Sequence, residues 1–182
     1  LKKIPASRDG FKIVLTDKNE IQLFDLKNLR VSKTIYHNGS IEKSTFSPTG
    51  EYFMIVKSDS SLSVFECNQG DTAVFKIRFS SPIVDSKYSP NGNNFFVITK
   101  DKQMYVYDSK NFASLVTIIL NAITTDANYS PNGFNIVLAD VDNYINVYNT
   151  QSNSIELTFK ASNSLLLSAK YSPNGKFLVV SS

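Results

Sequence analysis

The hydrophobic and polar positions of this chain follow the two-residue period of β-strands. The stretch 74–79 alternates without a break, with apolar Phe75, Ile77 and Phe79 on one face and charged Lys76 and Arg78 on the other. Short apolar runs, such as residues 52–56, are bounded by turn residues and are too short for helices. The pattern predicts an all-β fold in which less than about a tenth of the residues are helical.

A turn tetrapeptide recurs between these strands at a nearly fixed step. Its serines stand at 47, 89, 130 and 172, which gives steps of 42, 41 and 42 residues, and a weaker copy begins 40 residues before the first. Proline in the second place fixes φ for the bend, and glycine in the fourth accepts a positive φ. The copies are Ser7-Arg8-Asp9-Gly10, Ser47-Pro48-Thr49-Gly50, Ser89-Pro90-Asn91-Gly92, Ser130-Pro131-Asn132-Gly133 and Ser172-Pro173-Asn174-Gly175.

Each repeat holds four short antiparallel strands, which predicts a β-propeller. In one repeat the strands are expected at 52–56, 62–65, 74–79 and 83–88, and the other repeats follow the same plan. A lone sheet of this size cannot bury both faces, whereas sheets stacked radially bury them against their neighbours. We therefore expect one incomplete propeller domain over residues 1–182, with about four and a half blades. Its units begin near residues 4, 41, 83, 123 and 165.

The ends of the third strands resemble the WD-repeat family in a degenerate form. Tryptophan is absent, and the family's Trp-Asp pair corresponds to Phe24-Asp25, Phe65-Glu66, Tyr107-Asp108 and Tyr148-Asn149. The family's turn aspartate corresponds to Asp59, Asp101 and Asp142, with Lys18 beside Asp17 in the first unit. A lactonase-like enzyme propeller is a weaker resemblance, because that class carries a similar turn and period.

The WD resemblance implies a hydrogen-bond network that this chain does not complete. The family's histidine before the inner strand is matched only by His37, and its strand Ser/Thr only by Thr99. Lys57 and Asp140 take the Ser/Thr position in other units. We therefore expect packing of aromatic side chains to stabilise each blade more than polar contacts do. The resemblance also implies a larger ring, of about seven blades, with the missing blades supplied by the rest of the chain or by another chain.

Charge and composition argue against several classes of partner. Nineteen basic and sixteen acidic residues give a net charge of +3, and the lysines are scattered, whereas nucleic-acid binding usually needs a concentrated basic face. No apolar run approaches the roughly 18 residues of a membrane span. The single Cys67 allows no internal disulfide, which favours an intracellular location, cytoplasmic or nuclear.

Candidate catalytic and metal-binding chemistry is sparse in the sequence. His37, Ser40 and Asp59 could be read as a catalytic triad, but we expect the structural role of the family histidine, with a hydrogen bond in or near its blade. A zinc site needs about four suitable ligands, and we expect no metal, no cofactor and no enzymatic activity. The aspartates that recur at blade spacing are expected to cap turns rather than to bind calcium.

The sequence therefore predicts a non-enzymatic WD-like scaffold that mediates protein–protein interactions within a multiprotein assembly. The alternatives are a lactonase-like hydrolase and a subunit of a coat or transport complex. In WD-like propellers partners often bind the loop before the inner strand and the turn between the second and third strands. The candidate protein-binding rim is His37, Asn38, Lys57, Asp59, Lys100, Lys102, Asp140 and Asp142.

Overall fold

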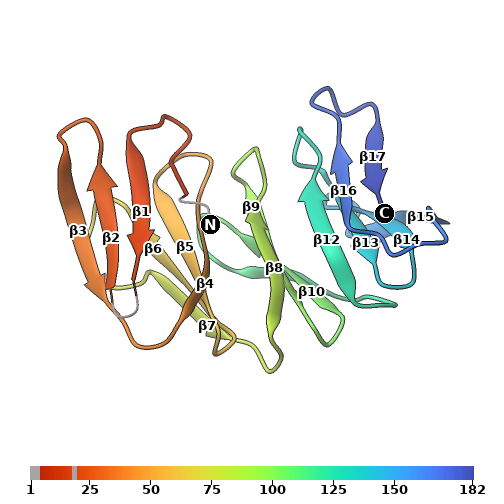
Figure 1. The fold of residues 1–182 in the computed structure, drawn as a ribbon, viewed down its shortest axis with the longest axis horizontal. Helices are drawn as coiled ribbons and strands as arrows, with labels where there is room; N and C mark the ends of the chain where they lie inside the picture. Colours follow the sequence, from red (N-terminus) through yellow and green to blue (C-terminus); the bar gives the residue numbers. More distant parts are fainter. Residues whose placement is uncertain (1–4, 18–19) are drawn as a thin grey trace. The chain divides into compact units, whose positions relative to one another are not determined.

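A computed structural model describes residues 5–17 and 20–182, and every regular element in that part of the chain is a β-strand (Figure 1). Lys18 and the expected start of the first unit near residue 4 lie outside the described residues. The strands fall into two compact units, Leu1–Pro82 and Ile83–Ser182. The prediction of an all-β fold is confirmed.

The first unit contains two antiparallel sheets. One has three strands, β1 (Lys12–Thr16), β2 (Glu20–Asp25) and β3 (Arg30–Tyr36). The other has four, β4 (Ile41–Phe46), β5 (Tyr52–Lys57), β6 (Ser61–Glu66) and β7 (Phe75–Arg78). Four strands were expected in each sheet, but in the first sheet the described inner segment makes only a single bridge, between Ala6 and Ile13.

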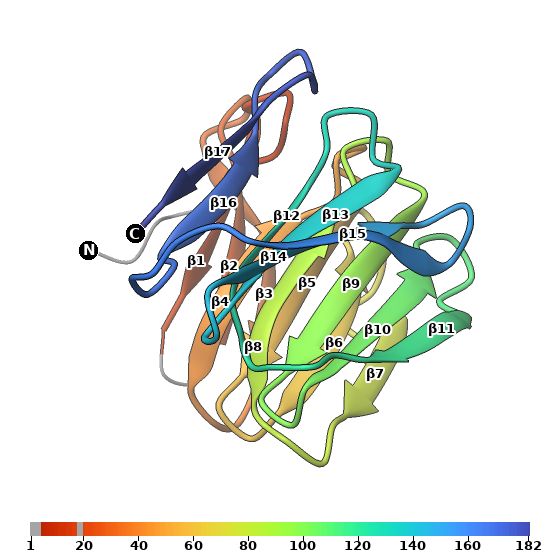
Figure 2. The ribbon, with the colours of Figure 1, turned by 90° about the vertical axis from the view of Figure 1, so that its right-hand side faces the viewer.

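The second unit contains two four-stranded sheets and one two-stranded sheet. The first sheet consists of β8 (Ile83–Tyr88), β9 (Asn94–Thr99), β10 (Gln103–Asp108) and β11 (Ser114–Ile119). The next consists of β12 (Thr124–Tyr129), β13 (Asn135–Asp140), β14 (Tyr144–Asn149) and β15 (Ser154–Lys160). The last consists of β16 (Ser168–Tyr171) and β17 (Leu178–Ser181). Each strand pairs with its neighbour in sequence, as in the blades of a propeller (Figure 2).

The recurring tetrapeptide joins the first and second strands of a sheet, as predicted. Its serine Oγ accepts the N–H of the residue five positions later, for example at 3.1 Å from Tyr52 to Ser47. Its glycine N–H donates to the carbonyl oxygen of the same serine, and Gly50 has φ +73°. The weaker copy forms the same turn, because Lys12 N–H donates to Ser7 Oγ at 2.9 Å. The repeat therefore includes the first sheet.

The core lies between the faces of neighbouring sheets within each unit. In the first unit, Val14, Ile21 and Leu23 of one sheet belong to the same buried cluster as Phe53 and Phe65 of the other. In the second unit, one cluster joins the sheet β8–β11 to the sheet β12–β15. A second cluster joins β13 and β14 to the sheet β16–β17. The aromatic residues expected to be buried, Phe65, Tyr107 and Tyr148, are all buried, which confirms that prediction.

Candidate protein-binding surface

In the first unit the loop before β4 meets the turn between β5 and β6. Lys57 Nζ donates to the carbonyl oxygen of Asn38 at 3.2 Å, and Ser58 N–H donates to the carbonyl oxygen of Ser40 at 3.0 Å. The structure thus brings together the two segments that carry the four candidate residues of this unit. The contacts fix a polar loop against a rigid β-turn, which is a common way to present a binding surface.

Asp59 caps its turn, as predicted, and adds an ion pair. Its Oδ1 accepts the N–H of Ser61 at 3.0 Å and the Ser61 hydroxyl at 2.5 Å. Its Oδ2 lies 3.3 Å from Arg78 Nη2, and both side chains remain largely open to solvent. The Ser61 hydroxyl is the main cause that lowers the Asp59 pKa, with the charge of Arg78 contributing less. The pairing of Arg78 with Asp59 was not predicted from the sequence, although the strand register places Arg78 opposite Ser61.

The hydrogen bond expected for His37 is not found. Both imidazole nitrogens are shielded from solvent, and neither has a hydrogen-bond partner among residues 5–17 and 20–182. The neighbouring Tyr36 side chain is 79% exposed. At this position the loop therefore exposes Tyr36, whereas the imidazole is shielded and the Asn38 carbonyl oxygen already accepts Lys57 Nζ.

In the second unit, the turn between β9 and β10 presents two exposed lysines, Lys100 and Lys102. Lys102 Nζ donates to the carbonyl oxygen of Asn121 at 3.3 Å, which ties this turn to the segment that leads into β12. Lys102 itself has φ +65°, and Ser60 and Asn143 have φ +65° and +70° at the equivalent places of two other turns. The shared conformation shows that these turns are one structural element, repeated.

Asp140 is not part of an exposed rim, because its side chain is buried. Its Oδ1 accepts the N–H groups of Asp142 at 3.0 Å and of Tyr144 at 2.9 Å. Its Oδ2 accepts Asn146 Nδ2 at 3.1 Å. The expectation that Asp142 caps this turn is wrong, since the carboxylate that receives the turn N–H groups is that of Asp140. Asp142 is exposed and remains a candidate for contact with a partner.

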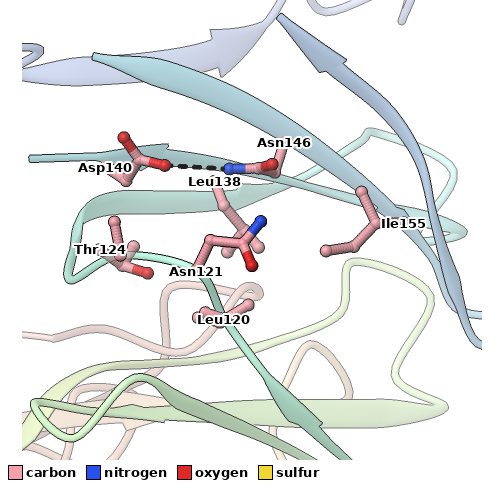
Figure 3. A pocket seen from close by; sticks show the side chains of 8 residues that line it. Leu120, Asn121, Thr124, Leu138, Asp140, Asn146 and Ile155 are labelled. Carbon is pink, nitrogen blue, oxygen red and sulfur yellow. Dashed lines mark hydrogen bonds between the residues drawn. The ribbon is translucent and has the colours of Figure 1, made fainter. Parts of the chain in front are cut away.

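A small cavity lies beside Asp140, within the second unit (Figure 3). Its volume of ≈ 10 Å³ is about what one buried water molecule requires. The space is too small for an organic substrate. It is lined by Leu120, Asn121, Ala122, Thr124, Leu138, Asp140, Asn146 and Ile155.

Charged side chains on the inner strands of the second unit form a network that sequence reasoning missed. Lys87 Nζ lies 3.0 Å from Asp85 Oδ2 and 3.7 Å from Asp126 Oδ1, and it donates to Asn128 Oδ1 at 2.9 Å. It also donates to the carbonyl oxygen of Ala127 on the neighbouring sheet at 2.5 Å. The sequence does mark the residue that makes this contact. Lys87 stands directly before Tyr88, the aromatic residue that ends its strand, and Asn128 stands directly before Tyr129.

The same contact recurs one sheet further along. Asn128, which occupies the position of Lys87, donates from Nδ2 to the carbonyl oxygen of Ala169 at 2.8 Å. Asp126 Oδ2 accepts the Ser168 hydroxyl at 2.8 Å and the Ala169 N–H at 3.0 Å. Burial raises the pKa of Asp126, but these hydrogen bonds and the charge of Lys87 outweigh it and hold the pKa below its ordinary value. The network joins three sheets. We interpret its side chains as structural contacts between sheets, because their polar atoms bond to neighbouring sheets.

In the first unit another lysine connects the two sheets. Lys33 Nζ on β3 donates to the carbonyl oxygens of Glu66 at 2.6 Å, of Gly70 at 2.7 Å and of Gln69. Burial lowers the pKa of Lys33, and nearby acidic groups oppose that shift. Because these carbonyl groups belong to Glu66, the last residue of β6, and to the loop that follows it, the ammonium group caps the end of that strand from the neighbouring sheet.

Two further features of the described part of the chain concern metal binding and membrane spanning. Among those residues, no group of three or more His, Cys, Asp or Glu side chains is placed to hold a metal ion. Over the same residues, no helix has the length and apolar character required to cross a membrane.

Comparison with known proteins gives a family match and a fold match. Residues 55–182 match the family described as Eukaryotic translation initiation factor eIF2A. The structure is similar to the crystal structure of the Cps50 (Swd1) β-propeller domain of Myceliophteria thermophila, with a TM-score of 0.78 and 16% sequence identity. The match covers 97% of this chain and 60% of that one, so the chain spans less than two thirds of the solved propeller. No curated protein matches the sequence.

Proposed function

The chain belongs to the family of the eukaryotic translation initiation factor eIF2A, and from this premise we propose that it is a non-enzymatic scaffold. In this proposal its WD-like propeller sheets dock other proteins of the translation-initiation assembly. The choice of translation initiation as the process rests on the family match. The proposed contact surface consists of the loops and turns of the rim. The sheets act as a rigid support that places those loops.

The observation that carries the proposal is the polar surface at the β9–β10 turn. Lys100 and Lys102 are exposed, and the hydrogen bond from Lys102 to Asn121 fixes the turn against the next segment. The exposed Asp142 lies on the corresponding turn of the next sheet of the same unit. A surface with charges of both signs on fixed turns suits a protein partner with a mixed polar contact, and it suits a polyanion less well.

A double charge reversal in the full-length protein tests this proposal. Lys100→Glu with Lys102→Glu inverts the charge of the β9–β10 turn and leaves the sheet core intact. The matched control is Lys110→Glu with Lys176→Glu, which makes the same charge change at two exposed lysines on loops at the other ends of the strands. Each tagged protein is expressed in the source cell, and the proteins retained on it are quantified by mass spectrometry alongside a thermal melt.

The proposal predicts that the control retains the proteins of translation initiation that bind the unmodified chain, whereas the rim variant loses at least one of them. Rim charges chiefly tune the association rate and its salt dependence, so the loss should be strongest at low salt. A rim variant that melts normally and keeps every partner in full amount would contradict docking on this surface.

A further inference from the structure

The outer strand of one of the four larger sheets differs from the other three outer strands in charge. Every outer strand except β11 carries at least two charged residues. β11 reads Ser-Leu-Val-Thr-Ile-Ile, and the whole stretch 111–125 around it has no charged side chain. The charged residues of the other outer strands are Arg30 and Lys33 on β3, Lys76 and Arg78 on β7, and Glu156 and Lys160 on β15.

β11 is the edge of its sheet, because the strand order is β11-β10-β9-β8 (Figure 2). Leu120 N–H donates to the carbonyl oxygen of Lys102 at 2.8 Å at the start of the β10–β11 pairing. Main-chain groups alternate in direction along an antiparallel strand, so those of Thr117 and Ile119 point away from β10. The edge therefore presents two adjacent N–H and C=O sets to an incoming strand.

The same alternation shows which residues of β7 and β15 have main-chain groups that point away from their sheets. Phe79 N–H donates to the Ser60 carbonyl oxygen at 3.0 Å, and Ala161 N–H donates to the Asn143 carbonyl oxygen at 3.0 Å. These bonds are equivalent to that of Leu120, so the outward positions are Lys76 and Arg78 on β7, and Thr158 and Lys160 on β15. Native proteins protect exposed strand edges with charged side chains, above all lysine. On β3 the corresponding positions are Thr34 and Tyr36, which are uncharged, but that strand still carries Arg30 and Lys33. β11 differs from the other outer strands because it has no charged residue at any position.

The side chains of β11 divide into an inward-packed set and an exposed set. Val116 and Ile118 turn inward and pack against the buried cluster of the second unit. Leu115 and Ile119 lie on the opposite face and are 53% and 81% exposed. An added strand would therefore gain main-chain hydrogen bonds along the edge and apolar contacts with these two side chains.

We infer that β11 binds an extended, uncharged segment of a partner protein, which pairs with it as a fifth strand of the sheet. The inference rests on the proposed docking function and names a second surface for it. A charged partner segment would lose hydration against this apolar edge without gaining an ion pair, which selects a neutral segment with apolar residues two positions apart.

The dimensions of the edge favour a peptide segment over a second copy of the chain. Six residues extend over about 20 Å, and two such strands paired edge to edge bury far less than the roughly 1,000 Å² that a specific interface between folded proteins requires. A flexible segment adds to the sheet without having to match any further surface. It can also cover Leu115 and Ile119 with its own side chains.

Peptide binding to the purified full-length protein tests this inference. The probe is a fluorescent peptide of about eight residues that alternates threonine and valine, and its control has the same sequence with alternate amides N-methylated, which blocks strand pairing. Thr117→Pro removes one outward N–H, a change that edge strands tolerate. Its matched control, Lys76→Pro, makes the same change at the equivalent outward position of β7. Fluorescence anisotropy measures binding, and circular dichroism measures folding.

The inference predicts saturable binding of the probe to the unmodified protein and to Lys76→Pro, and binding at least about tenfold weaker to Thr117→Pro. If the proline variant does not fold, Ile119→Lys replaces it, with the exposed Leu157→Lys on β15 as its control. The N-methylated peptide should not bind. Equal binding to the unmodified protein and the β11 variants, or no binding to the unmodified protein, would overturn the inference.

Sedimentation velocity of the same proteins without peptide tests whether a second copy of the chain, and not a peptide segment, pairs with β11. If the unmodified protein self-associates, Thr117→Pro abolishes that association and no peptide binds, then the partner of β11 is a second copy of the chain. That result would overturn the inference. These results are independent of the rim experiment. Failure at β11 leaves the Lys100 and Lys102 result untouched, and failure at the rim leaves the peptide result untouched.

Discussion

Phe65 stacks on Phe53 with ring centroids 5.2 Å apart and an interplanar angle of 14°. The two residues are register partners on β6 and β5. Phe95 and Tyr107 repeat the arrangement at 5.2 Å and 17° in another sheet, again as register partners. Aromatic stacking thus occupies the place where the WD family has its tryptophan, and a stacked pair contributes about 0.5–1.5 kcal/mol beyond burial.

Replacement of Phe65 by alanine tests the weight of this packing. Phe65 is 6% exposed and belongs to the cluster that joins the two sheets of the first unit. We expect Phe65→Ala to reduce the free energy of unfolding by about 3–5 kcal/mol. His37→Ala should cost less, because neither ring nitrogen has a hydrogen-bond partner in the described residues. Thermal melts that rank the two variants in the opposite order would refute the dominance of packing.

The turn between β13 and β14 depends on Asp140 rather than on Asp142. Asp140→Ala leaves the N–H groups of Asp142 and Tyr144 and the amide of Asn146 without their acceptor. We expect a cost of about 2–4 kcal/mol in unfolding free energy, since a buried carboxylate that accepts several hydrogen bonds is removed. Asp142→Ala, two residues away and exposed, is the control and should stay within about 0.5 kcal/mol. Urea titrations of both variants measure the difference.

Asp126 makes stability depend on pH in a defined window. Its folded-state pKa lies below the ordinary value of 3.8, so its contribution is present in full above that value and is lost as the pH falls through the folded pKa. We expect the unmodified protein to exceed Asp126→Asn in stability at neutral pH, and this excess to shrink as the pH falls below about 4. Urea midpoints at several pH values measure the excess, and an excess that grows toward acid would contradict the account.

Lys33 should stabilise the contact between the two sheets of the first unit. Lys33→Ala removes the three hydrogen bonds that the ammonium group donates to the last residue of β6 and to the loop after it, and we expect a loss of about 1–3 kcal/mol in unfolding free energy. Lys12 is the control, because it lies on the same sheet and makes one exposed hydrogen bond, to Asn68 at 2.9 Å. Lys12→Ala should change stability by less than about 0.5 kcal/mol. Equal effects of both variants on the melting temperature would show that the carbonyl contacts add nothing.

Much of the fold followed from the sequence because the turn chemistry and the strand period are local properties. The residues of β8 were expected at 83–88, where the structure has them, and the weak tetrapeptide at Ser7 forms the full turn. The β7 strand spans Phe75–Arg78 and is one residue shorter at each end than the predicted 74–79, although Val74 N–H and Phe79 N–H still donate to carbonyl oxygens of Val64 and Ser60. The hydrophobic pattern runs through these flanking residues and does not mark where the regular strand pairing ends.

The candidate site was less accessible to sequence reasoning because exposure and pairing depend on neighbouring sheets. Asp140 and Asp142 are both acidic residues near one turn, and only the three-dimensional hydrogen bonds show which of them is buried. Lys87 and Asp126 lie 39 positions apart in sequence and meet because their strands are neighbours. The repeat spacing contains the signal for that contact, since Asn128 and Lys87 hold the same place before an aromatic residue.

Site-specific photo-crosslinking tests the proposed docking most directly. A photoreactive residue replaces Lys100 in one full-length protein and Lys110 in a second one, so that the two probes differ only in the loop that carries them. After irradiation in the source cell, crosslinked proteins are identified by mass spectrometry. The account predicts crosslinks from position 100 to a protein of the translation-initiation machinery and none to that protein from position 110. Crosslinks to it from position 110 alone, or from neither position, would contradict the account.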